Sequence, residues 1–300
     1  MKVILGGIVR NIESNIGPIF KFIFSLKEVI PTLEVCLYEN NSTDNTKEVL
    51  NNLKESFDFV SVKCEEYPEE FFFSFPARTY KNEGCRIHKI AFARNKLLEM
   101  IKEKGLGNDD FVIMMDLDIK IPPDVNVITA ILEQMNTIKD IHVLFANGIQ
   151  GNGHYYDGYV FRSENLPFGP EILGDTFWSN EHMAKIQNKY EPNQPLIPVI
   201  SAFGGLAIYR ANVIKDCFYS ADITDELKEF YSKFEIEKPS ANQTHYNGCG
   251  LGIYIDNIFY KHNSGYNYPV CAEHVNFHLA IRKKGFTNMF ICPFLYYYWM

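Results

Sequence analysis

Apolar residues in the first half of the chain alternate between short continuous runs and segments with helical spacing. The continuous runs predict buried strands, and the segments between them repeat apolar residues three and four positions apart, which is typical of amphipathic helices. The predicted strands are 2–9, 33–38, 57–64 and 110–115, and the predicted helices are 16–26, 43–54, 87–104 and 125–138. Strands joined through helices of this length need crossover connections, which build a mostly parallel sheet covered on both faces.

The second half of the chain has a different pattern. A short apolar run at 142–146 precedes residues 147–200, which are rich in Gly, Asn, Pro and Tyr and show little periodicity. Long irregular segments in a compact domain usually form functional loops or lids. Regular patterns return as a strand at 199–209, a helix at 273–284 and a strand at 289–293. We therefore expect one α/β domain with a mostly parallel, Rossmann-like sheet flanked by helices and an irregular second half.

Composition and charge exclude several classes of protein. The formal net charge is −8 and the pI is about 5.5, so the chain lacks the basic surface of a general nucleic-acid binder. Its seven cysteines contain no C-x-x-C, which argues against a cysteine-rich zinc site or a disulfide framework. No apolar run is long enough to span a bilayer or to form a secretory signal, so we expect a cytoplasmic protein without a transmembrane segment.

Two carboxylates follow the fourth predicted strand. Asp116 and Asp118 stand two positions apart, so both side chains project from the same side of the chain as the strand ends. Like charges this close favour an intervening cation, and hard divalent cations take oxygen ligands. A D-x-D sequence by itself is also compatible with a solvated strand end.

A polar segment follows the second predicted strand. Residues 39–46 read Glu-Asn-Asn-Ser-Thr-Asp-Asn-Thr and lie directly before a predicted helix. Because open α/β sheets bind ligands at the carboxyl ends of their strands, Glu39 and Asn40 are placed to hydrogen-bond a base or a ribose. The alternative interpretation of these residues is an Asx- and Ser-rich helix start.

Three segments together resemble the nucleotide-sugar glycosyltransferases with the GT-A fold, of the family 2-like or capsule mannosyltransferase-like kind. Residues 39–46 resemble the family's motif after the second strand, residues 86–95 resemble its helix with an Ala-x-x-Arg-Asn core, and residues 116–118 resemble its metal-binding D-x-D. The segments follow the family's order within the first 125 residues. The resemblance implies a nucleotide-sugar-binding half at 1–125 and an acceptor-binding half at 126–300 of one GT-A domain.

The resemblance assigns roles to the residues of the first half. Asp118, together with Asp116, is expected to bind Mn²⁺ or Mg²⁺, which bridges the diphosphate and neutralises charge on the leaving nucleotide. Asp116 is alternatively a partner of the ribose or of sugar hydroxyls. The nucleoside and diphosphate contacts expected from the resemblance are Glu39, Asn40, Asp44, Arg86, Arg94 and Asp116.

In the second half, the resemblance extends to two segments expected to bind the acceptor. Residues 155–162 resemble a Tyr-Asp-x-x-x-x-Arg segment of capsule-type mannosyltransferase-like relatives, in which Asp157 is placed to bind a hydroxyl. The alternative for this segment is a packed loop with a structural Asp157–Arg162 pair. Gly204 and Gly205 resemble the family's Gly-Gly strand, where missing side chains let a ligand approach the backbone.

The candidate catalytic residues lie in the last predicted helix. Inverting members of the superfamily carry an acid there that takes the proton from the acceptor hydroxyl, and Glu273 is the candidate. His274 is the alternative base or a third metal ligand. His274 and His278 share a helix face, but the segment lacks the Glu of the H-E-x-x-H motif of zinc proteases, and His278 is expected to be structural.

The expected activity is metal-dependent transfer of a sugar, most simply a hexose, from a UDP- or GDP-sugar to a hydroxyl of a glycan, glycoprotein or other acceptor. A catalytically inactive carbohydrate- or nucleotide-sugar-binding protein is one alternative. A sugar-nucleotide pyrophosphorylase is less compatible, because the segment after the first strand is too short and lacks the family's lysine. An NAD enzyme is disfavoured, since no G-x-G-x-x-G follows the first strand.

Overall fold

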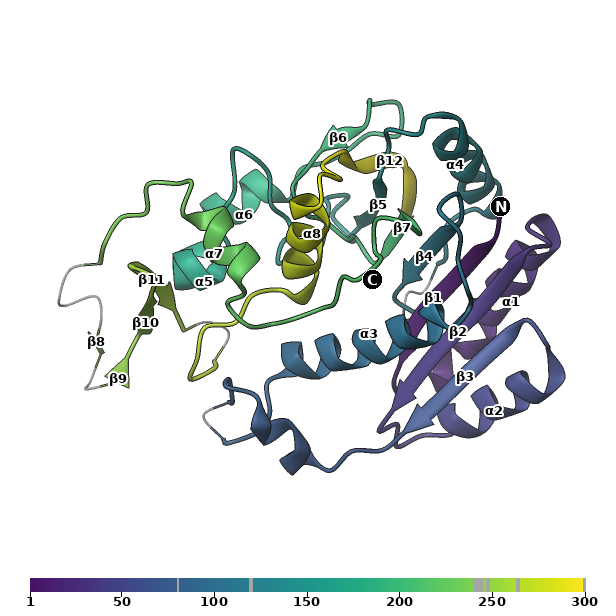
Figure 1. Cartoon of the computed structure of the whole chain (residues 1–300), viewed down its shortest axis with the longest axis horizontal. Coiled ribbons are helices and arrows are strands. Elements are labelled where there is room, and N and C mark those ends of the chain that lie inside the picture. The colour runs from purple at the N-terminus through teal and green to yellow at the C-terminus, as the bar shows by residue number, and fades with distance from the viewer. Residues whose placement is uncertain (80, 119–120, 240–244, 247–248, 263–264, 299–300) are drawn as a thin grey trace.

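A single large sheet runs through the computed structural model, which describes residues 1–79, 81–118, 121–239, 245–246, 249–262 and 265–298 (Figure 1). The strands are β1 (Val3–Val9), β2 (Leu33–Asn40), β3 (Val60–Glu65), β4 (Phe111–Met115), β5 (Val143–Ile149), β6 (Ile197–Pro198), β7 (Leu206–Arg210), β8 (His245–Tyr246), β9 (Cys249–Gly250), β10 (Gly252–Ile255), β11 (Ile258–Lys261) and β12 (Met289–Tyr298). Eight of them form the large sheet in the order β3-β2-β1-β4-β7-β5-β12-β6, and β8–β9 and β10–β11 form two separate pairs.

The helices account for most of the remaining regular structure. The α-helices are α1 (Ile16–Val29), α2 (Thr46–Ser56), α3 (Arg86–Lys102), α4 (Val125–Thr137), α5 (Pro170–Leu173), α6 (Asn180–Ile186), α7 (Asp225–Tyr231) and α8 (Glu273–Lys283). Short 3-10 helices are η1 (Glu13–Asn15), η2 (Glu69–Ser74) and η3 (Gly174–Trp178). Among the described residues, no helix combines the length and the apolar character needed to cross a bilayer.

The sheet is parallel where helices connect consecutive strands. β1, β2, β3 and β4 all run the same way, and the register places Val9 beside Glu39 at the carboxyl ends of β1 and β2. β7 is antiparallel to both of its neighbours, β4 and β5, while β5 and β12 are parallel. The expected α/β fold with a mostly parallel, helix-covered sheet is confirmed, and β7 is an antiparallel insertion that the sequence pattern did not indicate.

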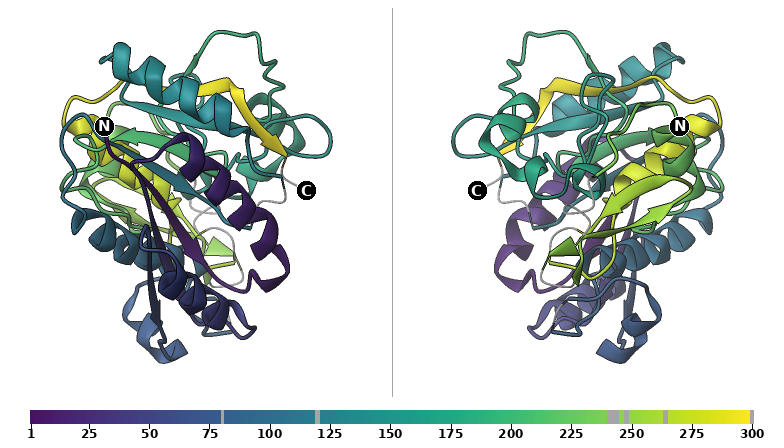
Figure 2. Two further views of the ribbon diagram at one scale, coloured as in Figure 1. Left: turned by 90° about the vertical axis from the view of Figure 1, so that its right-hand side faces the viewer. Right: turned by 90° about the vertical axis from the view of Figure 1, so that its left-hand side faces the viewer.

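Alternating side chains of the strands build two cores, one on each face of the sheet. Met114 on β4 belongs to the core that includes Leu97 of α3 and side chains of α8. Its neighbour Ile113 points to the other core, which includes Ile131 of α4 and side chains of α1 and α2. Figure 2 shows α1 and α3 on opposite sides of the first strands. Both faces are therefore covered, as continuous apolar strands require.

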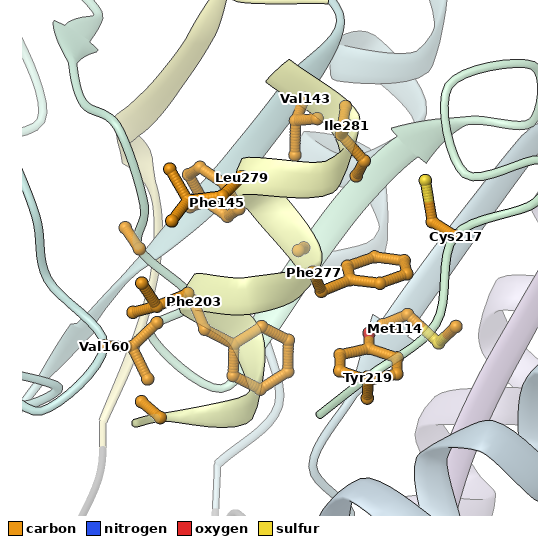
Figure 3. Close-up of a cluster of buried hydrophobic side chains, with 14 of the residues drawn as sticks. Met114, Val143, Phe145, Val160, Phe203, Cys217, Tyr219, Phe277, Leu279 and Ile281 are labelled. Atoms are coloured by element: carbon orange, nitrogen blue, oxygen red, sulfur yellow. The ribbon is translucent and has the colours of Figure 1, made fainter. Parts of the chain in front are cut away.

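Helix α8 lies at the centre of the second half of the chain. Its buried side chains pack against β5 and β7 and against two aromatic residues from connecting segments, Phe203 and Tyr219 (Figure 3). The ring of Tyr219 stacks on that of Phe277, with the centroids 4.1 Å apart. This packing fixes the first turn of α8 relative to the carboxyl end of β4.

Several element boundaries differ from those expected. The strand expected at 199–209 is confined to Leu206–Arg210, because Gly204 and Gly205 have φ values of 60° and 80° and break the extended chain before it. The strand expected at 289–293 continues to Tyr298 along β5. The segment 147–200 is mostly irregular, as expected, and contains only the short elements α5, η3, α6 and β6. Helix α7 and the β10–β11 hairpin carried too little periodicity to be predicted.

Candidate functional site

A pocket of about 570 Å³ lies where the carboxyl ends of β1, β2 and β4 meet the first turns of α3 and α8. This is the edge at which open α/β sheets bind ligands. The pocket brings together eight of the expected site residues, namely Asn40, Arg86, Arg94, Asp116, Asp118, Asp157, Glu273 and His274. Four other expected residues, Glu39, Asp44, Gly204 and Gly205, do not line it.

Arg94 connects two of the carboxylates in the pocket. Its Nη2 donates to Oδ1 of Asp116 over 2.9 Å, and its Nε donates to Oε1 of Glu273 over 3.1 Å. The guanidinium also lies over the rings of Phe203 and Tyr219, at 4.9 and 5.7 Å from their centroids. The sequence indicated a diphosphate partner at Arg94, whereas the structure gives this side chain two carboxylate partners.

Glu273 is the first residue of α8 and is almost fully buried. Burial raises the pKa of its carboxyl, because the charged form loses hydration, while the charge of Arg94 acts in the opposite direction. Ala272, the N-cap residue of α8, makes no side-chain cap hydrogen bond. A buried carboxylate oriented by an arginine has the properties of a general base, since its raised pKa strengthens its affinity for a proton.

Asp118 differs from Asp116 in its surroundings. Its side chain is exposed to the pocket. Partial loss of hydration, reinforced by the negative charge of Asp116, raises the pKa of Asp118 to about 6. Among the described residues, no three His, Cys, Asp or Glu side chains are grouped closely enough to hold a metal ion. His274 therefore does not complete a three-residue site with the two aspartates in this arrangement.

His274 is buried between aromatic rings. Its imidazole stacks on Phe203 with the centroids 3.9 Å apart and meets the ring of Tyr219 edge-on at 5.2 Å. Neither ring nitrogen has a hydrogen-bond partner among the described residues. Burial and the charge of Arg94 lower the pKa of His274 well below its usual value, so the ring is neutral near pH 7. This makes His274 a weaker candidate for the base than Glu273.

The segment after β2 combines structural and pocket-facing residues. The Oε1 atom of buried Glu39 accepts the backbone N–H of Ser42 over 2.7 Å, and its Oε2 has no partner among the described residues. Asp44 accepts the N–H groups of Glu13 and Thr46, both over 3.1 Å, and thereby supports the start of α2. Of the expected nucleoside contacts in this segment, Asn40 is the one that reaches the pocket.

Asp157 lies on the loop after β5 and faces the same pocket. Its Oδ2 accepts the backbone N–H of Gly204 over 3.1 Å. Burial, reinforced by the charges of Asp116 and Glu273, raises the pKa of Asp157 to about 7. The alternative of an Asp157–Arg162 pair is wrong, because the buried guanidinium of Arg162 pairs with Glu171 instead.

Gly204 and Gly205 form a tight turn that a side chain would disrupt. A Cβ atom on Gly204 would lie 2.1 Å from the carbonyl oxygen of Ala146, and one on Gly205 would meet the hydroxyl of Tyr297. The carbonyl of Gly205 accepts the N–H of Asp116 over 2.8 Å. These contacts within the protein are enough to explain why both positions are glycine, without an acceptor substrate close to their backbone. The turn therefore supports the wall of the pocket.

Other wall residues of the pocket were not among the expected site residues, and Arg10, Phe203 and Tyr159 are examples. Arg10 directly follows the carboxyl end of β1. Since ligands bind at this edge of the sheet, its place in the sequence could have identified it as a site residue. Phe203 precedes the Gly-Gly turn and Tyr159 lies two residues after Asp157, but nothing in their local sequence distinguishes them from core aromatics.

Comparisons with known proteins identify a family. The family model described as Cryptococcal mannosyltransferase 1 matches residues 8–251, which include Asp116, Asp118 and Asp157 and end before Glu273. No curated protein matches the chain.

Several solved structures are similar to parts of the chain. Mannosyltransferase PcManGT from Pyrobaculum calidifontis, in complex with GDP-Man and Mn²⁺, is 13% identical over 73% of this chain and 47% of its own, with a TM-score of 0.40. S. aureus TarS 1-349 in complex with UDP-GlcNAc is 16% identical over 73% and 49%, with a TM-score of 0.39. Glucosyl-3-phosphoglycerate synthase from Mycobacterium tuberculosis is 14% identical over 71% and 57%, with a TM-score of 0.36. The chain thus spans about half the length of these proteins, and likeness at this level assigns no activity.

Proposed function

Because the chain belongs to the family described as Cryptococcal mannosyltransferase 1, we propose that it is a glycosyltransferase that moves a sugar from a nucleotide-diphospho-sugar to an acceptor hydroxyl. The observation that carries the proposal is a single pocket with carboxylates from both halves of the chain. Asp116 and Asp118 line it from one half, and Asp157 and Glu273 line it from the other. Such a pocket offers anchors for a cation-bound diphosphate beside groups that accept a proton from a hydroxyl.

The donor nucleotide is proposed to lie along the carboxyl ends of the parallel strands. Asn40 and Arg10 line the pocket at the ends of β2 and β1, and Arg86 begins α3. The N-terminus of α3 faces the pocket, and a helix N-terminus favours a phosphate group, although the hydroxyl of Tyr266 already accepts the N–H of Arg86 over 3.2 Å. The name of the family makes a mannosyl donor the first to test, with UDP-sugars beside it.

The two aspartates fit a divalent cation, Mn²⁺ or Mg²⁺. The charge of Asp116 helps to raise the pKa of Asp118, and a cation beside both carboxylates relieves this repulsion. Two side chains are enough, because Mg²⁺ is commonly held by one or two carboxylates together with substrate phosphates and water. When bound, the cation supplies Lewis-acid stabilisation of the leaving diphosphate.

Glu273 is the proposed base, which makes the transfer an inverting one. Its burial and its contact with Arg94 support this role, and Asp157, with its pKa raised to about 7, is the second candidate. Replacing Glu273 with Gln is expected to leave donor binding intact and to abolish transfer. The anomeric configuration of the product, followed by NMR, tests the mechanism. Retention of configuration would contradict the base role and leave Glu273 as the partner of Arg94.

The proposal is tested by thermal unfolding and donor hydrolysis with a panel of GDP-mannose, UDP-glucose and UDP-GlcNAc, each with and without Mn²⁺. The correct donor raises the melting temperature by mass action, and Asp118→Asn is expected to remove the Mn²⁺-dependent part of the rise. Asp140→Asn, at an exposed position outside the pocket, is the control. Binding without hydrolysis or transfer would favour the inactive sugar-binding alternative, and no binding to any donor would contradict the proposed function.

A further inference from the structure

We infer that Arg94 is a positioning residue: it holds Asp116 and Glu273 in place relative to each other and does not itself bind the donor. The inference deepens the proposed function and rests on it. The three residues come from different elements, since Arg94 lies within α3, Asp116 follows β4 and Glu273 begins α8. Arg94 is therefore the direct link between the carboxylate at the end of β4 and the candidate base.

The geometry of the guanidinium suits a link of this kind. Nη2 donates to Asp116 over 2.9 Å and Nε donates to Glu273 over 3.1 Å, so two donors of one planar group serve two separate carboxylates. Phe203 and Tyr219 lie against the same guanidinium and restrict its movement. Arginine can make such a rigid, forked contact, whereas the single ammonium of lysine cannot match both directions.

Burial makes the arrangement costly to break. Arg94 is 4% exposed and Glu273 is 5% exposed, so each depends on the other for compensation of its charge. If the guanidinium turned toward a diphosphate, Glu273 would remain buried without its cation. The contacts with the carboxylates therefore persist while the donor is bound, and the positive charge for the diphosphate must come from elsewhere.

Besides Arg94, the cationic side chains that line the pocket are Arg10, Arg86 and Lys89, and Lys89 is paired with Glu69. We assign the charge to Arg86, which lies eight residues before Arg94 on the same helix, is exposed, and lines the pocket. Its positive charge acts on Asp118, whose pKa it lowers. The two arginines of α3 thus divide the tasks that the sequence assigned to both: Arg86 faces the donor, and Arg94 positions the carboxylates.

The experiment compares Arg94→Lys and Arg94→Met with the matched control Arg86→Met. Affinities for UDP and GDP are measured by calorimetry without Mn²⁺, so that a displaced Asp116 does not act on them through the cation, and kcat and KM are measured by hydrolysis of the donor with Mn²⁺ present. We expect both Arg94 variants to bind nucleotide within about twofold of the wild type and to lose about 100-fold in kcat, because misplaced catalytic groups act mainly on turnover. Arg86→Met is expected to weaken nucleotide binding about tenfold, the loss of one charge-assisted contact.

A double variant separates positioning from direct binding. If Arg94 acts through Glu273, Arg94→Met combined with Glu273→Gln loses less activity than the product of the two single losses. The inference is overturned if the losses multiply, if Arg94→Lys keeps wild-type kcat, or if either Arg94 variant weakens nucleotide binding as much as Arg86→Met does. Arg94→Lys keeps a buried positive charge and is therefore less prone to unfold than Arg94→Met. Thermal melting checks that each variant is folded. A wild-type chain that hydrolyses no donor contradicts the proposed function, while the binding measurements still test the roles of the two arginines.

Discussion

Two histidines one turn apart on α8 show how strongly the surroundings decide the role of a residue. His278 is fully buried and makes hydrogen bonds with Ser201 over 2.8 Å and with Tyr209 over 2.9 Å. His274 is also buried, yet neither of its ring nitrogens has a hydrogen-bond partner among the described residues, and its Nε2 lies 3.7 Å from Oε1 of Glu273. A buried polar group without a hydrogen bond lowers the stability of the folded state, so His274 is destabilising in a way that His278 is not.

Replacing each histidine with Phe is expected to have different effects on stability. His278→Phe removes two buried hydrogen bonds and leaves the hydroxyls of Ser201 and Tyr209 unpaired, so we expect a loss of about 2–4 kcal/mol in the free energy of unfolding. His274→Phe removes no hydrogen bond and replaces the imidazole with a phenyl ring that can pack against the same aromatic residues, so its loss is expected to stay below about 1 kcal/mol. Urea unfolding followed by fluorescence measures both, and equal losses would contradict the assignment of the two environments.

Among the elements, the turn before β7 constrains the pocket most tightly. Its backbone donates to the carboxylate of Asp157 through Gly204 and accepts the backbone N–H of Asp116 through Gly205, so one turn contacts two residues that line the pocket. Both glycines have positive φ, which L-residues rarely adopt. The turn therefore sets the distance between the carboxyl end of β4 and the loop after β5.

Gly204→Ala tests how much of this constraint is steric. Gly105 provides a matched control, because it has a similar φ of 65° but open space around the position of a Cβ atom. Gly105→Ala is expected to cost about 1 kcal/mol, the price of the left-handed conformation alone. Gly204→Ala adds a clash with a backbone carbonyl and is expected to cost about 3 kcal/mol or more. Equal midpoints of urea unfolding for the two variants would show that the turn relaxes freely.

At the scale of the whole molecule, the sheet crosses the boundary between the two expected halves. The edge of β4 pairs with β7 from residue 111 to residue 115, and Arg94 joins the end of β4 to α8. The core on the α3 side of the sheet also takes residues from both halves. The division near residue 125 thus separates the site residues of the first half from those of the second half, but it does not divide the hydrophobic core.

This continuity predicts that residues 1–125 do not fold when expressed alone. Without β7, the fragment exposes the edge of β4 and the apolar surface that α8 covers, and exposed strand edges favour aggregation. We expect the full chain to unfold in one transition in urea, with circular dichroism and fluorescence giving the same midpoint. A soluble 1–125 fragment with cooperative unfolding, or two separate transitions in the full chain, would contradict this expectation.

Local patterns determined much of this architecture. The apolar runs and the helical spacing predicted β1 to β4, α1, α3 and α4 within a few residues, because burial on one face or on both leaves a periodic trace in the sequence. The polar residues after β2 and β4 indicated a ligand site, since the carboxyl ends of parallel strands meet at one edge of the sheet.

Tertiary structure decided the rest, because the partners are distant in the sequence. Arg94 and Glu273 are 179 positions apart, and Asp157 meets Gly204 across 47 positions. No local pattern distinguishes an arginine that will face a phosphate from one enclosed by two carboxylates. The D-x-D sequence placed two aspartates at the end of a strand, and the folded chain alone paired Asp116 with Arg94 and left Asp118 open to the pocket.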